Sequence, residues 1–217
     1  MPDYRTKKQK QRGRLFFYLT SGLKWNVGDR VAFYTMTTSP EADKPILTSW
    51  GNLVADARRV CPRTLIEAGY VDDKRAAYLY DLEDIEQKFK FEYAGCITNE
   101  GNDVIHALVA GQFLPVNWIR ERWLKHHNTP QFKVVLIKAG NNPRLVKYLL
   151  EQYIAGQDLI ARLVVSKRWI YPGCRADWLA LVGECKTDLG DVAGYLAARE
   201  IWDNLMWKTK PADEMIR

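Results

Sequence analysis

The sequence predicts an α+β fold in which about five antiparallel strands form a central sheet covered by helices. Short segments rich in β-branched and aromatic residues are interleaved with segments whose apolar residues recur at helical spacing. Polar turns rather than long linkers join these segments. The chain has 217 residues and is 47% hydrophobic, so it can bury a sizeable core.

Five segments have the composition of strands. The first, VAFYTMT, is rich in β-branched and aromatic residues and is followed by the turn sequence TSPEADKP. The segments KFEYAGCIT and VIHALVA are separated by the polar turn NEGND, which predicts an antiparallel hairpin. The predicted strands are residues 31–37, 90–98, 104–110, 132–138 and 161–169.

Helices are predicted between these strands from their start and stop signals. Pro115 and Pro143 each begin a helix, and Gly156 ends the second one. Asp188 is expected to cap a last helix over residues 189–206, and residues 63–86 are expected to be helical or irregular. Between Pro45 and Pro62, apolar residues recur at helical spacing: Ile46, Trp50, Leu53, Val54 and Ala57.

We expect a flexible basic arm over residues 1–14, a single domain over residues 15–208 and a C-terminal tail over residues 209–217. The arm holds six Lys or Arg residues and one acidic residue, as in a polyanion contact or a solubilising tail. No segment is apolar enough to span a membrane, and the N-terminus lacks the core of a signal peptide, so a cytoplasmic protein is expected. Four scattered cysteines without a CxxC pair predict reduced, mostly buried thiols rather than a zinc site.

Charge is distributed unevenly along the chain. Residues 115–175 hold eleven Lys or Arg and three Asp or Glu, whereas residues 71–104 hold four and nine. The basic third has the electrostatic footprint of nucleic-acid binding. The sequence contains no GxxxxGK[ST] loop, no GxSxG motif and no dinucleotide fingerprint, so nucleotide hydrolysis and serine-hydrolase chemistry have no support.

The order of four segments resembles the HUH endonuclease superfamily, which includes rolling-circle replication initiators and relaxases. In that family a strand similar to FYTMTTSP is followed by a hairpin whose second strand carries two histidines separated by one apolar residue. A helix with a tyrosine nucleophile and a strand similar to VVSKRW come next. The counterparts here are residues 33–40, 104–111, 145–156 and 164–169, so the resemblance covers roughly residues 31–170.

This resemblance implies a plasmid or viral replication protein in the host cytoplasm, which binds single-stranded or hairpin DNA at an origin and nicks and joins it. The implied cofactor is a divalent cation, Mg²⁺ or Mn²⁺, which positions and polarises the scissile phosphate. The tyrosine hydroxyl attacks phosphorus, leaving a 5′-phosphotyrosine link and a free 3′-hydroxyl. The matching positions imply that His106 is a metal ligand and Tyr153 the nucleophile.

The metal motif departs from the family pattern. His106 matches the second histidine, and Val104, on the same face of the strand, replaces the first. Thr98 stands where relatives often have a glutamate, which leaves Glu100 and Asp103, beside the turn, as candidate supporting ligands. The alternative role for His106 is that of a buried histidine hydrogen-bonded to a neighbour.

Two tyrosines lie on the predicted tyrosine helix. Tyr148 and Tyr153 are five residues apart, which rotates them by about 140° relative to each other. Tyr153 follows Val146 at i+7 on the apolar stripe predicted to face the sheet, and it matches the main tyrosine of the family. Gln152 and Gly156 replace the two lysines of the family pattern. The alternative role for Tyr153 is ordinary packing against the sheet.

Three functions stay open at this point. The first is a tyrosine DNA strand transferase, the second an inactive descendant that binds nucleic acid in origin recognition or regulation, and the third an interaction role without nucleic acid. His126 and His127, at a helix end, are expected to be solvated cations rather than ligands. Four basic residues are candidates for phosphate contact, with solvated surface charge as the alternative: Arg144, Lys147, Lys167 and Arg168.

Overall fold

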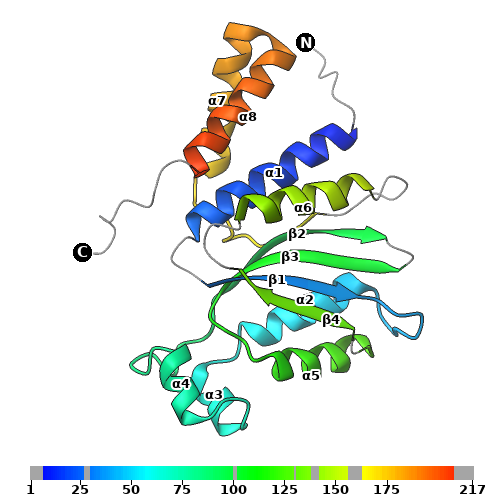
Figure 1. Ribbon diagram of the computed structural model, residues 1–217, viewed down its shortest axis with the longest axis vertical. Helices are drawn as coiled ribbons and strands as arrows, with labels where there is room; N and C mark the ends of the chain where they lie inside the picture. The colour runs from blue at the N-terminus through cyan, green and yellow to red at the C-terminus, as the bar shows by residue number, and fades with distance from the viewer. Residues whose placement is uncertain are drawn as a thin grey trace. The chain divides into compact units, whose positions relative to one another are not determined.

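The computed structural model confirms the predicted α+β fold, with a five-stranded antiparallel sheet flanked by helices (Figure 1). The structure describes residues 7–26, 30–99, 102–129, 131–137, 142–155 and 163–207, with only the backbone for residues 7–10, 99, 142–143, 150, 152–155 and 206–207. The chain divides into a helical unit, Met1–Val27 with Lys167–Arg217, and a sheet unit, Gly28–Ser166. The domain expected over residues 15–208 therefore spans parts of both units.

The sheet unit contains the five described strands in the order β4-β1-β3-β2-β5, and every neighbouring pair is antiparallel. The predicted hairpin is confirmed, because β2 and β3 pair over their whole length from Phe91 opposite Gly111 to Asn99 opposite Asp103. The central strand is thus β3, which carries His106. The strands are β1 (Arg30–Thr37), β2 (Phe91–Asn99), β3 (Asp103–Gly111), β4 (Phe132–Leu136) and β5 (Leu163–Val165).

Helices lie on both faces of this sheet (Figure 1). On one face α2 (Ile46–Ala57) packs against α5 (Val116–His127). On the other face α6 (Asn142–Ala155) packs against β2. The segment of uncertain structure, residues 63–86, contains two short helices, α3 (Pro62–Glu67) and α4 (Asp73–Leu79). The predicted starts of α2 and α5 after Pro45 and Pro115 are confirmed.

The main core lies between the sheet and the pair α2 and α5. Because side chains alternate along a strand, β3 sends Ile105, Ala107 and Val109 into this core and His106 to the opposite face. Three tryptophans of the two helices are among the largest side chains of this core, and all are nearly inaccessible to solvent: Trp50, Trp118 and Trp123.

His127 is buried rather than solvated, contrary to expectation. Its Nδ1 lies 3.0 Å from Ser49 Oγ, and its Nε2 lies 3.0 Å from Thr38 Oγ1. The Ser49 hydroxyl donates to the His126 carbonyl at 2.7 Å, so it accepts from His127 Nδ1–H, and Nε2 accepts from Thr38. This network joins α5 to α2 and to the residue that follows β1. His126 is also engaged, with Nε2 at 2.8 Å from Asp56 Oδ2.

The helical unit contains α1 (Lys7–Trp25), α7 (Cys174–Leu189) and α8 (Asp191–Trp207). Residues 7–14, expected in a flexible arm, instead begin α1. Lys, Arg and Gln favour helix, and the helix continues into buried residues such as Leu15 and Leu19. Residues 1–6 and the expected tail over residues 209–217 lie outside the described residues.

Asp188 does not cap the last helix, because it lies in the final turn of α7. Gly190, at φ 79°, ends that helix, and its N–H donates to the Lys186 carbonyl at 2.9 Å. Two helices therefore occupy the end of the described chain where one was predicted. Their antiparallel packing is visible in Figure 1.

The last strand is also shorter than predicted, since β5 ends at Val165. The Ser166 N–H donates to the Tyr93 carbonyl at 2.9 Å, and the Ser166 hydroxyl accepts from the Tyr93 N–H at 2.9 Å. Lys167 and Arg168 then turn away from the strand direction. Their side chains are therefore not part of the sheet.

The cysteines and the apolar character of the helices were also predicted from the sequence. All four cysteines are free thiols, and three of them are buried, as predicted. Within the described ranges, none of the helices has the length and apolar character needed to cross a membrane.

Protonation of His127 is expected to weaken the folded state. Burial lowers the pKa of His127, so the unfolded chain gains this proton at a higher pH than the folded chain does. The free energy of unfolding should therefore fall as the pH decreases below about 6.5. Urea unfolding of the wild type and of His127→Gln between about pH 8 and about pH 5 measures this effect. Identical pH dependence in the two proteins would contradict it.

Candidate nucleic-acid interface

His106 lies in a row of side chains that crosses four strands of the sheet. Its partners in the register are Thr35 on β1 and Cys96 on β2, and Thr35 in turn pairs with Lys133 on β4. Directly opposed residues of antiparallel strands point to the same face, so these four side chains share the face opposite the main core. The His106 side chain itself is buried, with 3% of its surface exposed.

An aromatic cluster forms around His106. Phe33 of β1 stacks on it, with ring centroids 6.0 Å apart and an interplanar angle of 13°. Tyr148 of α6 meets both rings edge-on, at 6.1 Å from His106 and 5.8 Å from Phe33. The Tyr148 side chain remains 39% exposed. The cluster therefore has a buried end at His106 and an accessible end at Tyr148.

The same face becomes progressively more exposed toward β4. Cys96 on β2 is fully buried, Phe33 and Thr35 on β1 are half-buried, and Lys133 on β4 is exposed. Val135, also on β4, is 43% exposed. We call this accessible part of the sheet face the β1–β4 surface; it consists of Phe33, Thr35, Lys133, Val135 and Tyr148.

Two of the four predicted phosphate-binding residues lie beside this surface. Arg144 and Lys147 are exposed on α6; Arg144 precedes Lys147 by three residues and Tyr148 by four, so it shares a side of the helix with each, whereas Lys147 is next to Tyr148 in sequence. Lys147 Nζ lies 3.8 Å from a carboxylate oxygen of Glu151. Together with Lys133 on β4, they are three exposed cations on the elements α6 and β4, which both contribute to the β1–β4 surface.

The other two, Lys167 and Arg168, belong to the helical unit. They are exposed in the turn that follows the sheet unit. The four predicted basic residues therefore belong to two different units of the chain.

The predicted nucleophile, Tyr153, lies on α6, but its side chain is outside the described residues. The apolar stripe on which it was placed is buried at Val146 and Leu149, as predicted. Among the described side chains of α6, Tyr148, the other tyrosine of the predicted helix, has its ring in contact with that of His106.

The residues described around His106 do not provide a divalent-cation site. Val104 and Thr98 are buried on the same face and offer no carboxylate or imidazole. Asp103 is exposed and stands an odd number of positions from His106, so alternation places it on the opposite face. Glu100 lies outside the described residues. Within the described part of the chain no three His, Cys, Asp or Glu side chains are grouped to hold a metal, so the implied cation does not fit this donor set.

Sequence reasoning missed Phe33, Thr35 and Lys133. Each lies in a segment that was correctly predicted as a strand, but their meeting depends on the register between strands. Tyr34, between Phe33 and Thr35 in sequence, points to the opposite face of the sheet, into the main core beside Trp50. Its environment differs accordingly, because burial there raises the pKa of its hydroxyl. The signal that could have found Phe33 and Thr35 is the alternation of side chains along a strand, because these two residues alternate with the buried Tyr34 and Met36 and so share the other face.

Comparison of this chain with protein-family models, with curated proteins and with solved structures gives no match. The interpretation of the β1–β4 surface therefore depends on its own geometry and charge.

Close packing of β2 against β3 at His106 requires a glycine. A Cβ on Gly95 would collide with the main-chain carbonyl of His106, which cannot move without shifting β3. We expect Gly95→Ala to lower the free energy of unfolding by about 1–3 kcal/mol. Gly51→Ala in α2 is the matched control, because nothing lies within 4 Å of its added Cβ, and it should stabilise by about 0.5–1 kcal/mol. Denaturant titration compares the two, and wild-type stability of Gly95→Ala would contradict this packing.

Proposed function

We propose that this chain binds single-stranded DNA across the β1–β4 surface, as an HUH-like replication protein that acts in origin recognition. Binding, rather than cleavage, is the function that the geometry supports best. The observation that carries the proposal is the exposed ring of Tyr148, held against Phe33 and His106 and flanked by Lys133.

The aromatic cluster supports stacking with bases. Base–aromatic stacking contributes about 1–3 kcal/mol per base and tolerates every base, because each has a π-face. Phe33 and His106 contact one side of the Tyr148 ring and restrict its rotation. The Tyr148 side chain therefore loses less conformational freedom when a base stacks on its other side. Base faces are accessible in an unpaired strand and are covered by neighbours in a duplex, which favours single-stranded or hairpin-loop DNA.

The cations around the ring support contact with the backbone. Lys133 is exposed on the edge strand, and Arg144 and Lys147 are exposed on α6, so both elements that contribute to the β1–β4 surface beside β1 carry cations. Each phosphate neutralised on a single strand contributes about 0.7 to the slope of log affinity against log salt. The resemblance to rolling-circle initiators supports an origin of replication as the place of action.

Substitution of Tyr148 and Lys133 should weaken DNA binding. Fluorescence anisotropy with a labelled single-stranded oligonucleotide is expected to show about tenfold weaker binding for Tyr148→Ala, because a stacking platform is lost. Lys133→Gln should lower the salt slope by about 0.7.

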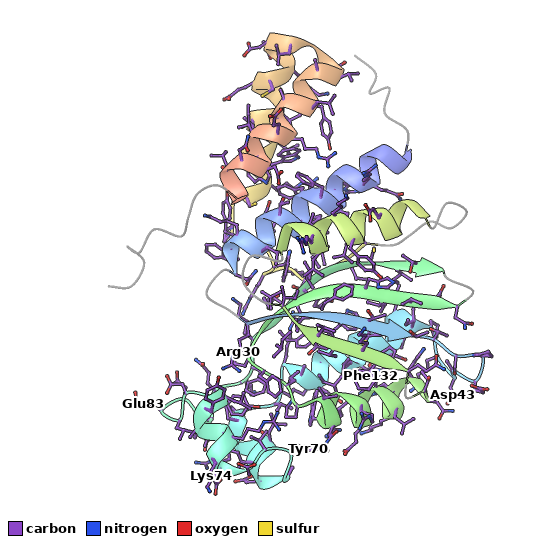
Figure 2. The ribbon with its side chains drawn as sticks, in the orientation of Figure 1. Arg30, Asp43, Tyr70, Lys74, Glu83 and Phe132 are labelled. Carbon is purple, nitrogen blue, oxygen red and sulfur yellow. The ribbon has the colours of Figure 1, made fainter. Side chains whose placement is uncertain are left out.

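The matched controls lie on α4, in the acidic part of the sheet unit (Figure 2, near Lys74). Tyr78 is 81% exposed, and Lys74 is an exposed cation, but neither belongs to the β1–β4 surface. Tyr78→Ala and Lys74→Gln should bind as the wild type does. Equal losses in controls and test variants, or no loss in either, would overturn the proposal.

Strand cleavage is the second candidate, and the contact between Tyr148 and His106 favours it. In this reaction a tyrosine hydroxyl forms a bond to phosphorus and the 3′-oxygen of the strand leaves with the electron pair. Tyr153 stays the nucleophile predicted from the resemblance, and Tyr148 is the tyrosine that the geometry brings to His106.

We expect no covalent protein–DNA adduct, because the described residues bring no group of three metal ligands together at His106. The measurement is a denaturing gel of the protein with end-labelled single-stranded DNA and Mn²⁺ or Mg²⁺. Tyr148→Phe, Tyr153→Phe and His106→Ala are run in parallel. An adduct that needs the cation and disappears in His106→Ala would contradict binding without cleavage, and the tyrosine variant that abolishes it would identify the nucleophile.

A further inference from the structure

We propose a second contact for single-stranded nucleic acid, on the helical unit, formed by the exposed indole of Trp25 with Tyr171 and flanking cations. It shares only its ligand class with the proposed function and uses none of the residues of the β1–β4 surface. We call it the Trp25 surface; it consists of Trp25, Tyr171, Lys24, Lys167 and Arg168.

Two segments far apart in the sequence are held together to make this surface. The Asn26 side-chain amide donates to the Trp169 carbonyl at 3.0 Å and to the Gly22 carbonyl at 2.7 Å. The Trp169 indole N–H donates to the Tyr18 carbonyl at 2.6 Å. A Cβ on Gly22 would collide with the Trp169 ring, so the glycine permits this approach. The turn that begins at Lys167 is therefore fixed on the C-terminal end of α1.

Trp25 differs from the other tryptophans described in the helical unit, because it is exposed to solvent and they are buried in the core. Its side chain is 51% exposed, whereas Trp169, Trp178 and Trp202 of the same unit are buried. The ring lies 5.7 Å from that of Tyr171. The Tyr171 hydroxyl donates to Asp177 at 2.6 Å, which fixes the second ring as well. Two positioned rings with an open face are a platform for a planar ligand.

The charge around this platform is positive. Lys167 and Arg168 are exposed in the turn that leads to Tyr171, and Lys24 precedes Trp25. Residues 11–26 and 167–176, the two segments of the helical unit that meet here, contain no Asp or Glu. The first acidic residue after them, Asp177, is engaged by Tyr171. Flat rings beside cations suit alternating bases and phosphates, whereas an acidic protein or an anionic lipid surface would use the cations without a need for stacked rings.

A chain with two such contacts gains affinity for strands that reach both. Binding at one surface raises the effective concentration of the strand at the other, without any new contact. Loss of the Trp25 surface should therefore weaken binding to long strands more than binding to short ones.

The test uses the full chain with single-stranded oligonucleotides that carry the photo-crosslinking base 5-iodouracil, together with anisotropy titrations. Trp25→Leu keeps an apolar contact for Tyr171 and removes the stacking ring, and Lys167→Gln with Arg168→Gln removes two cations. We expect about tenfold weaker binding of long strands for Trp25→Leu. The double lysine–arginine variant should lower the salt slope by about 1.4. Tyr78→Leu and Lys74→Gln serve as controls and should change neither quantity.

The site of crosslinking separates this proposal from the proposed function. Crosslinks to peptides containing Trp25 or Tyr171 support the Trp25 surface. Crosslinks confined to β1, β4 and α6, with wild-type binding in Trp25→Leu, overturn it and leave the β1–β4 surface standing. An absence of DNA binding also overturns the Trp25 surface as a nucleic-acid contact. So does the result that Trp25→Leu weakens binding to anionic vesicles but leaves DNA binding unchanged.

Discussion

The pairing of β1 with β3 is the constraint on which the candidate site depends. Thr35 faces His106 in this register, and Phe33 faces Leu108, so the aromatic cluster and the main core fall on opposite faces of one sheet. A shift of one residue would move His106 into the core and Ile105 out of it. The large apolar area buried by Trp50, Trp118 and Trp123 makes that shift costly. The packing of one face thereby positions the binding residues of the other.

Composition, periodicity and turn signals predicted most strands of the sheet unit, but neither α7 nor the burial of His127. The β-branched and aromatic residues of VAFYTMT and the turn NEGND predicted β1 and the β2–β3 hairpin closely, and proline positions predicted the starts of α2 and α5. Helix α7 was not predicted, because its apolar residues do not form one stripe. Leu179, Leu181 and Val182, for example, lie on several sides of the helix. Burial of His127 was missed for another reason, since Ser49 and Thr38, which satisfy its ring, are far from it in sequence.

The elements that carry the candidate site could be predicted from the sequence, but the contacts between their side chains could not. His106 was identified on the correct strand from one motif, and the resemblance directed attention to the helix that carries Tyr148. Which tyrosine meets the histidine depends on the rotation of α6, and the choice between Tyr148 and Tyr153 could not be made from helical spacing alone. The basic segment of residues 115–175 likewise divides between two units, which no count of charges reveals.

The two proposed surfaces share one physical design. Each places a partly exposed aromatic ring against a second ring on elements that also carry exposed Lys or Arg, and each is held by buried contacts at its base. In the sheet unit the base is the His106 row, and in the helical unit it is Trp169 with Asn26. Binding surfaces of this kind need neither a metal nor a catalytic base, which agrees with the donor set described around His106.

The most direct measurement is hydrogen–deuterium exchange of the full chain with and without a saturating single-stranded oligonucleotide. The account predicts slower exchange in peptides that cover β1, β4 and the first half of α6, with α3 and α4 unchanged. Bound DNA that leaves the exchange of β1, β4 and α6 unaltered would contradict the assignment of the β1–β4 surface as a single-stranded DNA contact.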